Sequence, residues 1–350
     1  MGLKLTPRAI EVLIQQQAGF ICDHQLPSGA IPWYHGGITD PWDHIECAIA
    51  LDIAGRFDEA KRAYLWLSDV QNPDGSWYLS YMNDKPQDLT RDTNNSSYLA
   101  CGLLCHYTAT RDMEIMREMW PVLDKAISFT LSLQQSGGEI CWAYDTNNIA
   151  YPLALLASSC CIWQSLMCGV RIAKLLGIDK PEWSDASQRL LKAINEHPTL
   201  FHGSGDKRYE YAMSWYYPVL AGTVNGERAK EHLLGHWQDF VIDGWGCKCV
   251  VEAPWWVTVA ETCELSLALA RIGEYDMAGH LLEWIFKLRD SDGRFFTGIK
   301  IPEGEIWPPQ EKPTWVAAAV VMATTAQMRQ GLRGVLFAPS GGIHEHKGSR

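Results

Sequence analysis

Charged residues are scarce in this sequence, and basic residues are in the minority among them. Of its 350 residues 20% are charged, and 30 Lys and Arg stand against 41 Asp and Glu, a formal net charge of −11. The Lys and Arg residues form no basic stripe along the chain. Because binding to a phosphate backbone requires clustered basic residues, we expect no nucleic-acid partner, and anionic membrane surfaces are disfavoured for the same reason.

Long apolar runs and linker segments are also missing. The longest apolar run, Trp315–Met322, is far shorter than the roughly 20 residues of a membrane-spanning helix. The first residues lack the apolar stretch of a signal peptide. No Pro-, Gly- or Ser-rich linker divides the chain. We therefore predict one domain over residues 1–335 and a tail over residues 336–350, in which Gly348-Ser349-Arg350 resembles a cloning remnant.

Cysteine is plentiful, but its pattern does not indicate disulfides or a metal site. The number of cysteines, 11, is odd, and most of them lie inside apolar helical segments, where a free cysteine acts as a small hydrophobic residue. Cys247-Lys248-Cys249 is too closely spaced for a zinc knuckle. We predict a reduced, cytoplasmic setting and neither a metal nor a cofactor.

Helices with two distinct patterns alternate along the chain. Six segments are rich in Ala, Leu, Cys and Ser and have few charges, which predicts buried helices. These are Asp43–Ala54, Asn94–Thr108, Ser158–Leu176, Tyr211–Val224, Val259–Ile272 and Thr314–Met328. The first five are followed by amphipathic helices with one charged face, namely Asp58–Val70, Asp112–Leu133, Pro181–Ile194, Glu227–Phe240 and Tyr275–Leu288.

The sixth buried helix has no following partner, but the N-terminal helix Pro7–Gln17 can serve as one. That pairing closes a ring. An open solenoid would need polar terminal caps, and the sequence offers none. The repeat therefore predicts an all-α fold, a closed (α/α)6 barrel.

Three outer helices end in related loops: Gln71–Trp77, Gln134–Trp142 and Arg289–Phe296. In each loop Asp-Gly or Gly-Gly makes the turn, and an aromatic residue follows. We interpret these loops as structural staples between neighbouring helix pairs.

The loop Gln71-Asn72-Pro73-Asp74-Gly75-Ser76-Trp77 matches the Q-x-x-D-G-S-W motif of squalene–hopene and oxidosqualene cyclases, and it follows an outer helix as it does in that family. The six-pair ring resembles class II terpene cyclases and the β-subunits of protein prenyltransferases. Over Leu5–Gln330 the chain is similar to single-domain class II cyclases, including the cyanobacterial merosterolic acid synthases. The resemblance implies a meroterpenoid cyclase, in the cytoplasm or weakly attached to a membrane, that folds a prenylated aromatic acid into rings.

The resemblance also implies a catalytic acid. Where squalene-type cyclases carry D-x-D-D-T-A, this chain has Asp92-Thr93-Asn94-Asn95, and the aspartate that protonates the alkene is replaced by Asn94. Asp92 is then the leading candidate acid, with Asn94 and Asn95 as hydrogen-bond donors to its carboxylate. Two alternatives stay open: Asp92 caps the helix, or the acid is Asp43 or Glu261.

Glu261 and Glu264 lie three residues apart and share one helix face. Burial together would make them repel and raise one of their pKa values, so Glu261 is the second candidate acid. Glu261 and Cys263 also imitate the Asp-x-Cys zinc pair of protein prenyltransferases. The last buried helix has no His to complete that set, and two ligands are too few for zinc.

The other candidates are mostly aromatic residues in the buried helices or in the loops that lead into them. We predict that they line a substrate pocket at the rim where the inner helices begin: Trp33, Tyr34, Trp42, His44, Trp163, Tyr211, Trp215, Tyr216, Trp255, Trp256, Trp307 and Trp315. Aromatic faces stabilise a passing cation and hold a chain in a folded conformation. Core packing is the alternative for each one taken singly.

Three functional hypotheses follow. The first is a terpene cyclase with a small hydrophobic prenylated substrate and no obligate protein partner. The second is a carbohydrate-active (α/α)6 barrel enzyme, because such enzymes also line clefts with Trp and use paired carboxyl groups. The third is a non-catalytic isoprenoid-binding barrel. The low charge of the inner helices favours the dry cavity of a cyclase.

Overall fold

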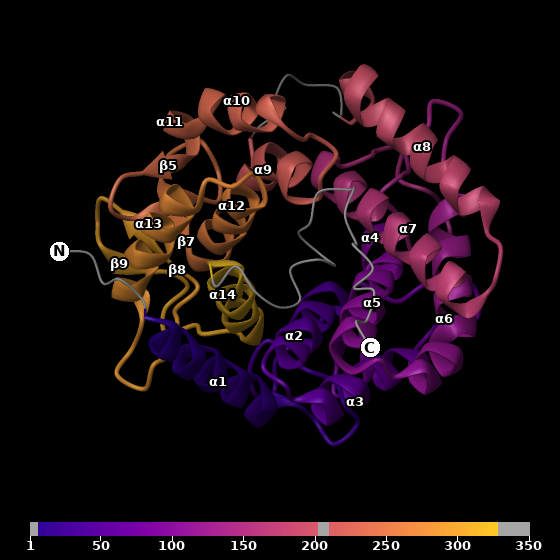
Figure 1. The fold of residues 1–350 in the computed structure, drawn as a ribbon, viewed down its shortest axis with the longest axis horizontal. Helices are drawn as coiled ribbons and strands as arrows, with labels where there is room; N and C mark the ends of the chain where they lie inside the picture. Colours follow the sequence, from indigo (N-terminus) through magenta and orange to yellow (C-terminus); the bar gives the residue numbers. More distant parts are fainter. Residues whose placement is uncertain (1–5, 202–209, 328–350) are drawn as a thin grey trace, which may run out of the picture.

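A computed structural model describes residues 6–201 and 210–327, and over these residues the chain forms a ring of paired helices (Figure 1). The inner helices are α2 (Pro41–Ile53), α4 with α5 (Thr93–Ser97 and Leu99–Thr110), α7 (Leu156–Leu176), α9 (Ala212–Leu220), α12 (Val259–Arg271) and α14 (Thr314–Gln327). The outer helices are α1 (Pro7–His24), α3 (Phe57–Asp69), α6 (Met113–Ser132), α8 (Pro181–Glu196), α10 with α11 (Glu227–Gly235 and Trp237–Phe240), and α13 (Tyr275–Ile285).

The ring is closed by contacts between its first and last inner helices. Each inner helix contacts the next one along the ring, and α14 returns to contact both α2 and α1 (Figure 1). The predicted all-α barrel of six helix pairs is therefore confirmed, including the pairing of α1 with α14. The boundary predicted at residues 335 and 336 lies outside the described residues.

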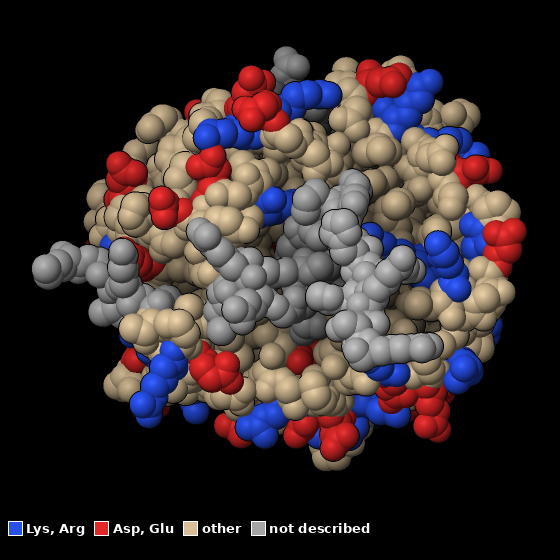
Figure 2. All heavy atoms as spheres, in the orientation of Figure 1, with Lys and Arg blue, Asp and Glu red and all other residues tan. Residues whose placement is uncertain are grey.

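Burial separates the two helix classes as the composition predicted. On α14 eleven residues, from Thr314 to Ala326, are buried, whereas α3 buries only one face, through residues such as Ala63 and Leu67. Among the described helices α7 alone is long and apolar enough to cross a membrane. Its apolar stretch is 72% buried inside the ring, so we assign α7 to the protein core. Figure 2 shows acidic and basic side chains interspersed around the edge of one face.

The loops that follow the outer helices tie neighbouring pairs together. The Gln71 amide donates to the carbonyl oxygens of Gly75, in its own loop, and of Val122, on α6, at 3.0 and 2.8 Å. The buried Trp77 indole donates to the Leu67 carbonyl at 2.8 Å. Gln134 repeats this arrangement with Gly138 and with Ala186 on α8. The same device, missed in the sequence, recurs where Gln25 bonds to Gly29 and to Glu59 on α3.

The structure also contains short strands that the sequence did not predict. A five-stranded antiparallel sheet has the order β5 (Val241–Ile242), β6 (Gly246–Lys248), β7 (Trp255–Thr258), β8 (Gly298–Ile301) and β9 (Glu305–Ile306). Two further pairs join β1 (Ser80–Met82) to β2 (Lys85–Asp88) and β3 (Arg91–Asp92) to β4 (Ala143–Tyr144). These strands have only two to four residues, too few for an alternating pattern to stand out. Because β7 runs directly into α12, the sheet lies beside the rim where the inner helices begin.

Candidate functional site

A pocket of about 650 Å³ opens at the rim where α2, α4, α7 and α9 begin. Its polar lining is Asp40, Asp92, Asn95, Ser158, Glu210 and Ser214. Its aromatic lining is Trp42, Trp142, Phe201 and Tyr211, and its aliphatic lining is Leu79, Leu153, Leu155, Leu156, Ala157 and Met213. Acidic groups therefore face a largely apolar wall.

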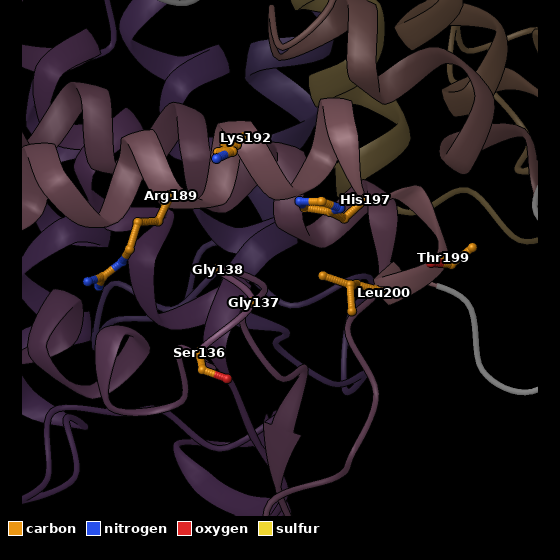
Figure 3. A pocket seen from close by; sticks show the side chains of 8 residues that line it. All are labelled: Ser136, Gly137, Gly138, Arg189, Lys192, His197, Thr199 and Leu200. Atoms are coloured by element: carbon orange, nitrogen blue, oxygen red, sulfur yellow. The ribbon is translucent and has the colours of Figure 1, made fainter.

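A second hollow, of about 520 Å³, lies outside the ring between α8 and the loop that follows α6. Figure 3 shows Arg189 and Lys192 on α8 and His197 beyond it, near the turn at Gly137 and Gly138. None of the described residues that line this hollow carries a carboxyl group. It cannot supply the paired acids that the rim pocket offers.

Asp40 caps α2 and borders the pocket. Its Oδ1 accepts hydrogen bonds from the backbone N–H groups of Trp42 and Asp43 at 2.8 and 3.2 Å. The Asn95 amide donates to its Oδ2 at 3.5 Å. Burial raises the pKa of Asp40 to about 6, even though these donors favour the charged form.

Asp92 plays the same capping part on α4. Its Oδ1 accepts from the backbone N–H groups of Asn94 and Asn95 at 2.6 and 3.0 Å. Burial, together with the nearby charge of Asp40, raises the pKa of Asp92 to about 7. The Asn94 side-chain amide is fully buried and has no hydrogen-bond partner among the described residues. Asp92 is thus a helix cap that also reaches the pocket, and the Asn94 and Asn95 groups that donate to it are backbone N–H groups.

Asp43 lies in the first turn of α2 and is not the cap of that helix, because Asp40 holds this position. Burial raises the pKa of Asp43 well above its usual range, and the charges of Asp40 and Glu264 add to this effect. One turn further on, Glu46 accepts from the Trp42 indole at 3.1 Å. Burial and the charge of Glu264 raise the pKa of Glu46 in the same way.

Glu261 and Glu264 face this cluster from α12. Glu264 accepts hydrogen bonds from the hydroxyls of Tyr216 and Tyr217 on α9, the latter at 2.6 Å. Burial raises the pKa of Glu264 to about 7, against the two tyrosine donors. Glu261 is half-buried and accepts from the Thr258 hydroxyl. The fully enclosed member of this pair is therefore Glu264, which the sequence did not single out.

These carboxyl groups form one electrostatic cluster, although they come from helices far apart in the sequence. The charge of Glu264 affects Asp43 and Glu46, and the charge of Asp40 affects Asp92. Carboxyls that hold a proton near neutral pH lie beside others that can be ionised. Such a set provides both partners of general acid–base catalysis.

The aromatic residues predicted to line one pocket lie in different parts of the structure. Trp42 lines the pocket, with edge contacts to Tyr98 and Tyr217 at 5.9 and 6.0 Å between ring centroids. Trp33 and Trp315 meet edge to face at 6.0 Å. The side chains of Trp163, Tyr216 and Trp215 are buried, and Trp215 stacks on Phe240 at 5.0 Å.

His44 belongs to the core. It is fully buried, its Nδ1 accepts from the Ile31 N–H at 3.1 Å, and its Nε2 lies 2.8 Å from the Ala63 carbonyl oxygen. Burial lowers the pKa of His44 to about 4, so its imidazole is neutral at neutral pH.

Four predicted aromatic side chains are exposed: Tyr34, Tyr211, Trp255 and Trp307. Of these, Tyr211 lines the pocket. The Trp256 indole, on β7, donates at 2.9 Å to the carbonyl oxygen of Trp307, which directly follows β9. The candidate set is therefore divided between the pocket wall, the core and the sheet surface.

Several pocket and cluster residues were absent from the predicted site: Asp40, Glu46, Glu210, Glu264, Tyr217 and Trp142. Asp40 could have been found, because an acidic residue directly before Pro41 is a helix-cap signal. Trp142 was taken for an outer staple, yet it lines the pocket. The described residues contain no group of three or more His, Cys, Asp and Glu that could hold a metal ion.

Comparison with known proteins finds glycoside hydrolases among the relatives of this chain. No family model matches the chain. It is 42% identical over 315 residues to the MMP endo-(1,4)-3-O-methyl-alpha-D-mannosidase of Mycolicibacterium hassiacum, covering 90% of this chain and 86% of the relative. It is also 28% identical over 128 residues to an uncharacterized glycosyl hydrolase of Methanocaldococcus jannaschii, covering 36% of this chain and 20% of that protein.

Solved structures share the fold at low sequence identity. A glycosidase variant in complex with glucose superimposes with a TM-score of 0.73 and 15% identity, over 92% of this chain and 98% of the other. A GH63 mannosylglycerate hydrolase from Thermus thermophilus, also in complex with glucose, gives a TM-score of 0.68 and 12% identity, over 89% and 99% of the two chains.

The comparisons correct the functional expectation from the sequence. The class II terpene cyclase assignment is wrong, and so are the isomerase chemistry and the small hydrophobic prenylated substrate, because the relatives are glycosidases that act on carbohydrate. The second hypothesis, a carbohydrate-active barrel, fits better. The Gln71–Trp77 motif led to the wrong function because this loop holds neighbouring helix pairs together. It can do so in any ring of helix pairs, whatever substrate the ring binds. The chain belongs to the family of the MMP endo-(1,4)-3-O-methyl-alpha-D-mannosidase of Mycolicibacterium hassiacum.

Proposed function

We propose that this protein is an endo-acting glycoside hydrolase that cleaves (1,4) links between 3-O-methyl-α-D-mannose units. The observation that carries the proposal is the 42% identity to an enzyme of that activity, over 90% of this chain. The rim pocket and its carboxyl cluster supply suitable chemistry. A cytoplasmic location, suggested by 11 unpaired cysteines, is part of the proposal.

The pocket wall suits a methylated sugar. An O-methyl group replaces a hydroxyl donor with an apolar surface, which gains from contact with aliphatic side chains. Leu153, Leu155, Leu156 and Met213 offer such a surface, while Asp40, Asp92 and Asn95 offer hydrogen bonds to the remaining hydroxyls. Trp42 presents a flat indole against which a pyranose ring can pack.

Asp43 is the proposed general acid. It must carry a proton at neutral pH to protonate the leaving oxygen, and burial beside Asp40 raises its pKa in the required direction. Asp43 directly follows the pocket-lining residue Trp42 in the first turn of α2, and it has no capping role.

Glu261 is the proposed general base. It also lies in a first turn, that of α12, where the helix dipole favours a negative charge. The Thr258 hydroxyl donates to its carboxylate and orients it. Glu264 and Glu46 lie one turn deeper in their helices, bonded to Tyr217 and Trp42, and we assign them positioning roles.

The test is incubation with purified (1,4)-linked 3-O-methyl-α-D-mannose oligosaccharides, followed by chromatographic sizing of the products. Cleavage within the chain is expected. Asp43→Asn and Glu261→Gln should each lower kcat by roughly 100-fold or more.

Asp145→Asn serves as the matched control, since Asp145 accepts backbone N–H groups in an exposed loop and should leave kcat unchanged. Release of single sugars from one end would contradict the endo assignment. Full activity in Asp43→Asn or in Glu261→Gln would remove the role assigned to that residue.

A further inference from the structure

Trp255 presents an exposed indole on the five-stranded sheet. It is the first residue of β7, and 41% of its side chain is exposed. The Lys248 ammonium lies 5.1 Å from the centre of its ring, and Lys248 is itself only 6% exposed. That ammonium also donates to the Val251 carbonyl at 3.4 Å. One face of the indole is therefore backed by a buried cation, which leaves the other face for solvent or ligand.

The segment that carries Trp255 is joined to the pocket by backbone pairing. The Val251 N–H donates to the Glu210 carbonyl, and the Ala212 N–H donates to the Cys249 carbonyl, both at 3.0 Å. Tyr211, between these two bonds, forms a bridge with Val250. Glu210 and Tyr211 line the pocket, and Tyr211 is 53% exposed. The hairpin that ends at Trp255 is thus held by backbone contacts against the pocket residues Glu210 and Tyr211.

We infer that Trp255, together with Tyr211, forms a distal subsite that holds polysaccharide units outside the catalytic pocket. The inference rests on the proposed function, because an enzyme that cuts within a chain must hold units beyond the one being cleaved. The C–H faces of pyranose rings pack against exposed indole faces, which recognise a sugar without requiring a charge. A ring already fixed by Lys248 loses little conformational entropy on binding.

Trp307 provides a matched comparison on the same sheet. It is 39% exposed and also has a lysine over its ring, with the Lys300 ammonium 3.6 Å from the ring centre. In the sheet register Trp255 pairs with Ile301, whereas Lys300 pairs with Trp256. Because successive strand residues point to opposite faces, the pair of Lys300 and Trp307 lies on the other face from Trp255.

The experiment compares wild type, Trp255→Ala and Trp307→Ala on (1,4)-3-O-methyl-α-D-mannose oligosaccharides of increasing length. Trp255→Ala should lower kcat/KM for long chains about tenfold, through KM, equivalent to about 1.4 kcal/mol of binding. It should leave the shortest cleaved oligosaccharide unaffected. Trp255→Phe should restore most of the loss, and Trp307→Ala should match wild type at every length.

Equal kcat/KM of Trp255→Ala and wild type on long chains would overturn the subsite, and so would an equal loss at every length. Calorimetric titration of the longest oligosaccharide into the inactive Asp43→Asn variant, with and without Trp255→Ala, tests the subsite by binding alone. A wild type that binds but cleaves none of these chains would reject the proposed function, while a Trp255-dependent affinity would still support the subsite.

Discussion

The hydroxyl of Tyr217 donates a 2.6 Å hydrogen bond to Oε1 of Glu264, and this bond joins the inner helices α9 and α12. Both side chains are buried, and the Tyr217 ring also packs edge to face against Trp42 at 6.0 Å. A single phenol therefore links the carboxyl cluster to an aromatic wall of the pocket.

Tyr217→Phe should remove the hydrogen bond to Glu264 and keep the shape of the aromatic side chain. Glu264 would lose one of its two tyrosine donors, so its pKa should rise further. The free energy of unfolding should fall by about 2 kcal/mol, as expected for a buried hydrogen bond to an acidic group. Denaturant titration measures the loss.

Tyr98→Phe is the control for that variant. Tyr98 makes a similar ring contact with Trp42, at 5.9 Å, but its hydroxyl makes no hydrogen bond to a described residue. Stability should stay near that of wild type. Equal losses in the two variants would mean that the Glu264 hydrogen bond contributes nothing specific.

The stability conferred by Asp92 should depend on pH. In the unfolded chain its carboxyl ionises near pH 4, whereas the folded protein raises its pKa to about 7. Between these values unfolding releases a proton, so rising pH favours unfolding. Asp92→Asn keeps a good cap and removes this dependence. Its Tm relative to wild type should therefore rise as the pH is increased from about 4 to about 7.

Asp112→Asn is the matched control, because Asp112 caps α6 through the N–H groups of Glu114 and Ile115. Partial burial acts to raise the pKa of Asp112. The two backbone donors and Lys61 act in the opposite direction and outweigh burial, so the pKa of Asp112 is lowered. Folded and unfolded states are then both ionised over the same pH interval. A Tm difference that drifts with pH as much for Asp112→Asn as for Asp92→Asn would refute this assignment.

Asp52→Ala should destabilise the protein without affecting catalysis. Its carboxylate bonds to His106 Nδ1 at 2.7 Å and accepts from the Tyr64 hydroxyl at 3.0 Å, with all three side chains buried. Removing it strands two polar groups in the core, which should cost about 4 kcal/mol of unfolding free energy. Asp52 follows Asp43 by nine residues, about 13 Å along α2. The kcat of the folded protein should stay unchanged, and a drop in kcat would indicate coupling to the site.

Gly75→Ala tests the loop staple. Gly75 has a φ of +95°, and an added Cβ would lie 2.3 Å from the Lys125 carbonyl oxygen on α6. Gly55 has a φ of +77° but open space around it. Gly55→Ala should therefore lose about 1 kcal/mol from backbone strain alone, and Gly75→Ala clearly more. Equal losses measured by thermal denaturation would show that the close approach to α6 carries no cost.

Much of the fold could be predicted because local pattern and burial coincide in this architecture. A helix that is apolar on all sides, such as Thr314–Gln327, must lie in the inner layer of the ring. A helix with one apolar face, such as Phe57–Asp69, must lie in the outer layer. The same reasoning paired α1 with α14. The β7–β8 pairing could not be predicted, because its strands are short and 39 residues separate Thr258 from Gly298, so neither periodicity nor proximity indicates it.

The functional error had a physical origin in what the sequence by itself determines. The positive φ of Gly75 and the burial of Trp77 favour the same loop motif in any ring of helix pairs. The motif therefore indicates the architecture of the ring but not the substrate. Only the tertiary structure decided that Asp43, Asp92 and Glu264, from three inner helices, share one electrostatic cluster, because helix starts far apart in sequence meet at one rim. Burial at that rim then raises their pKa values, an effect that depends on neighbours in space and that no local pattern records.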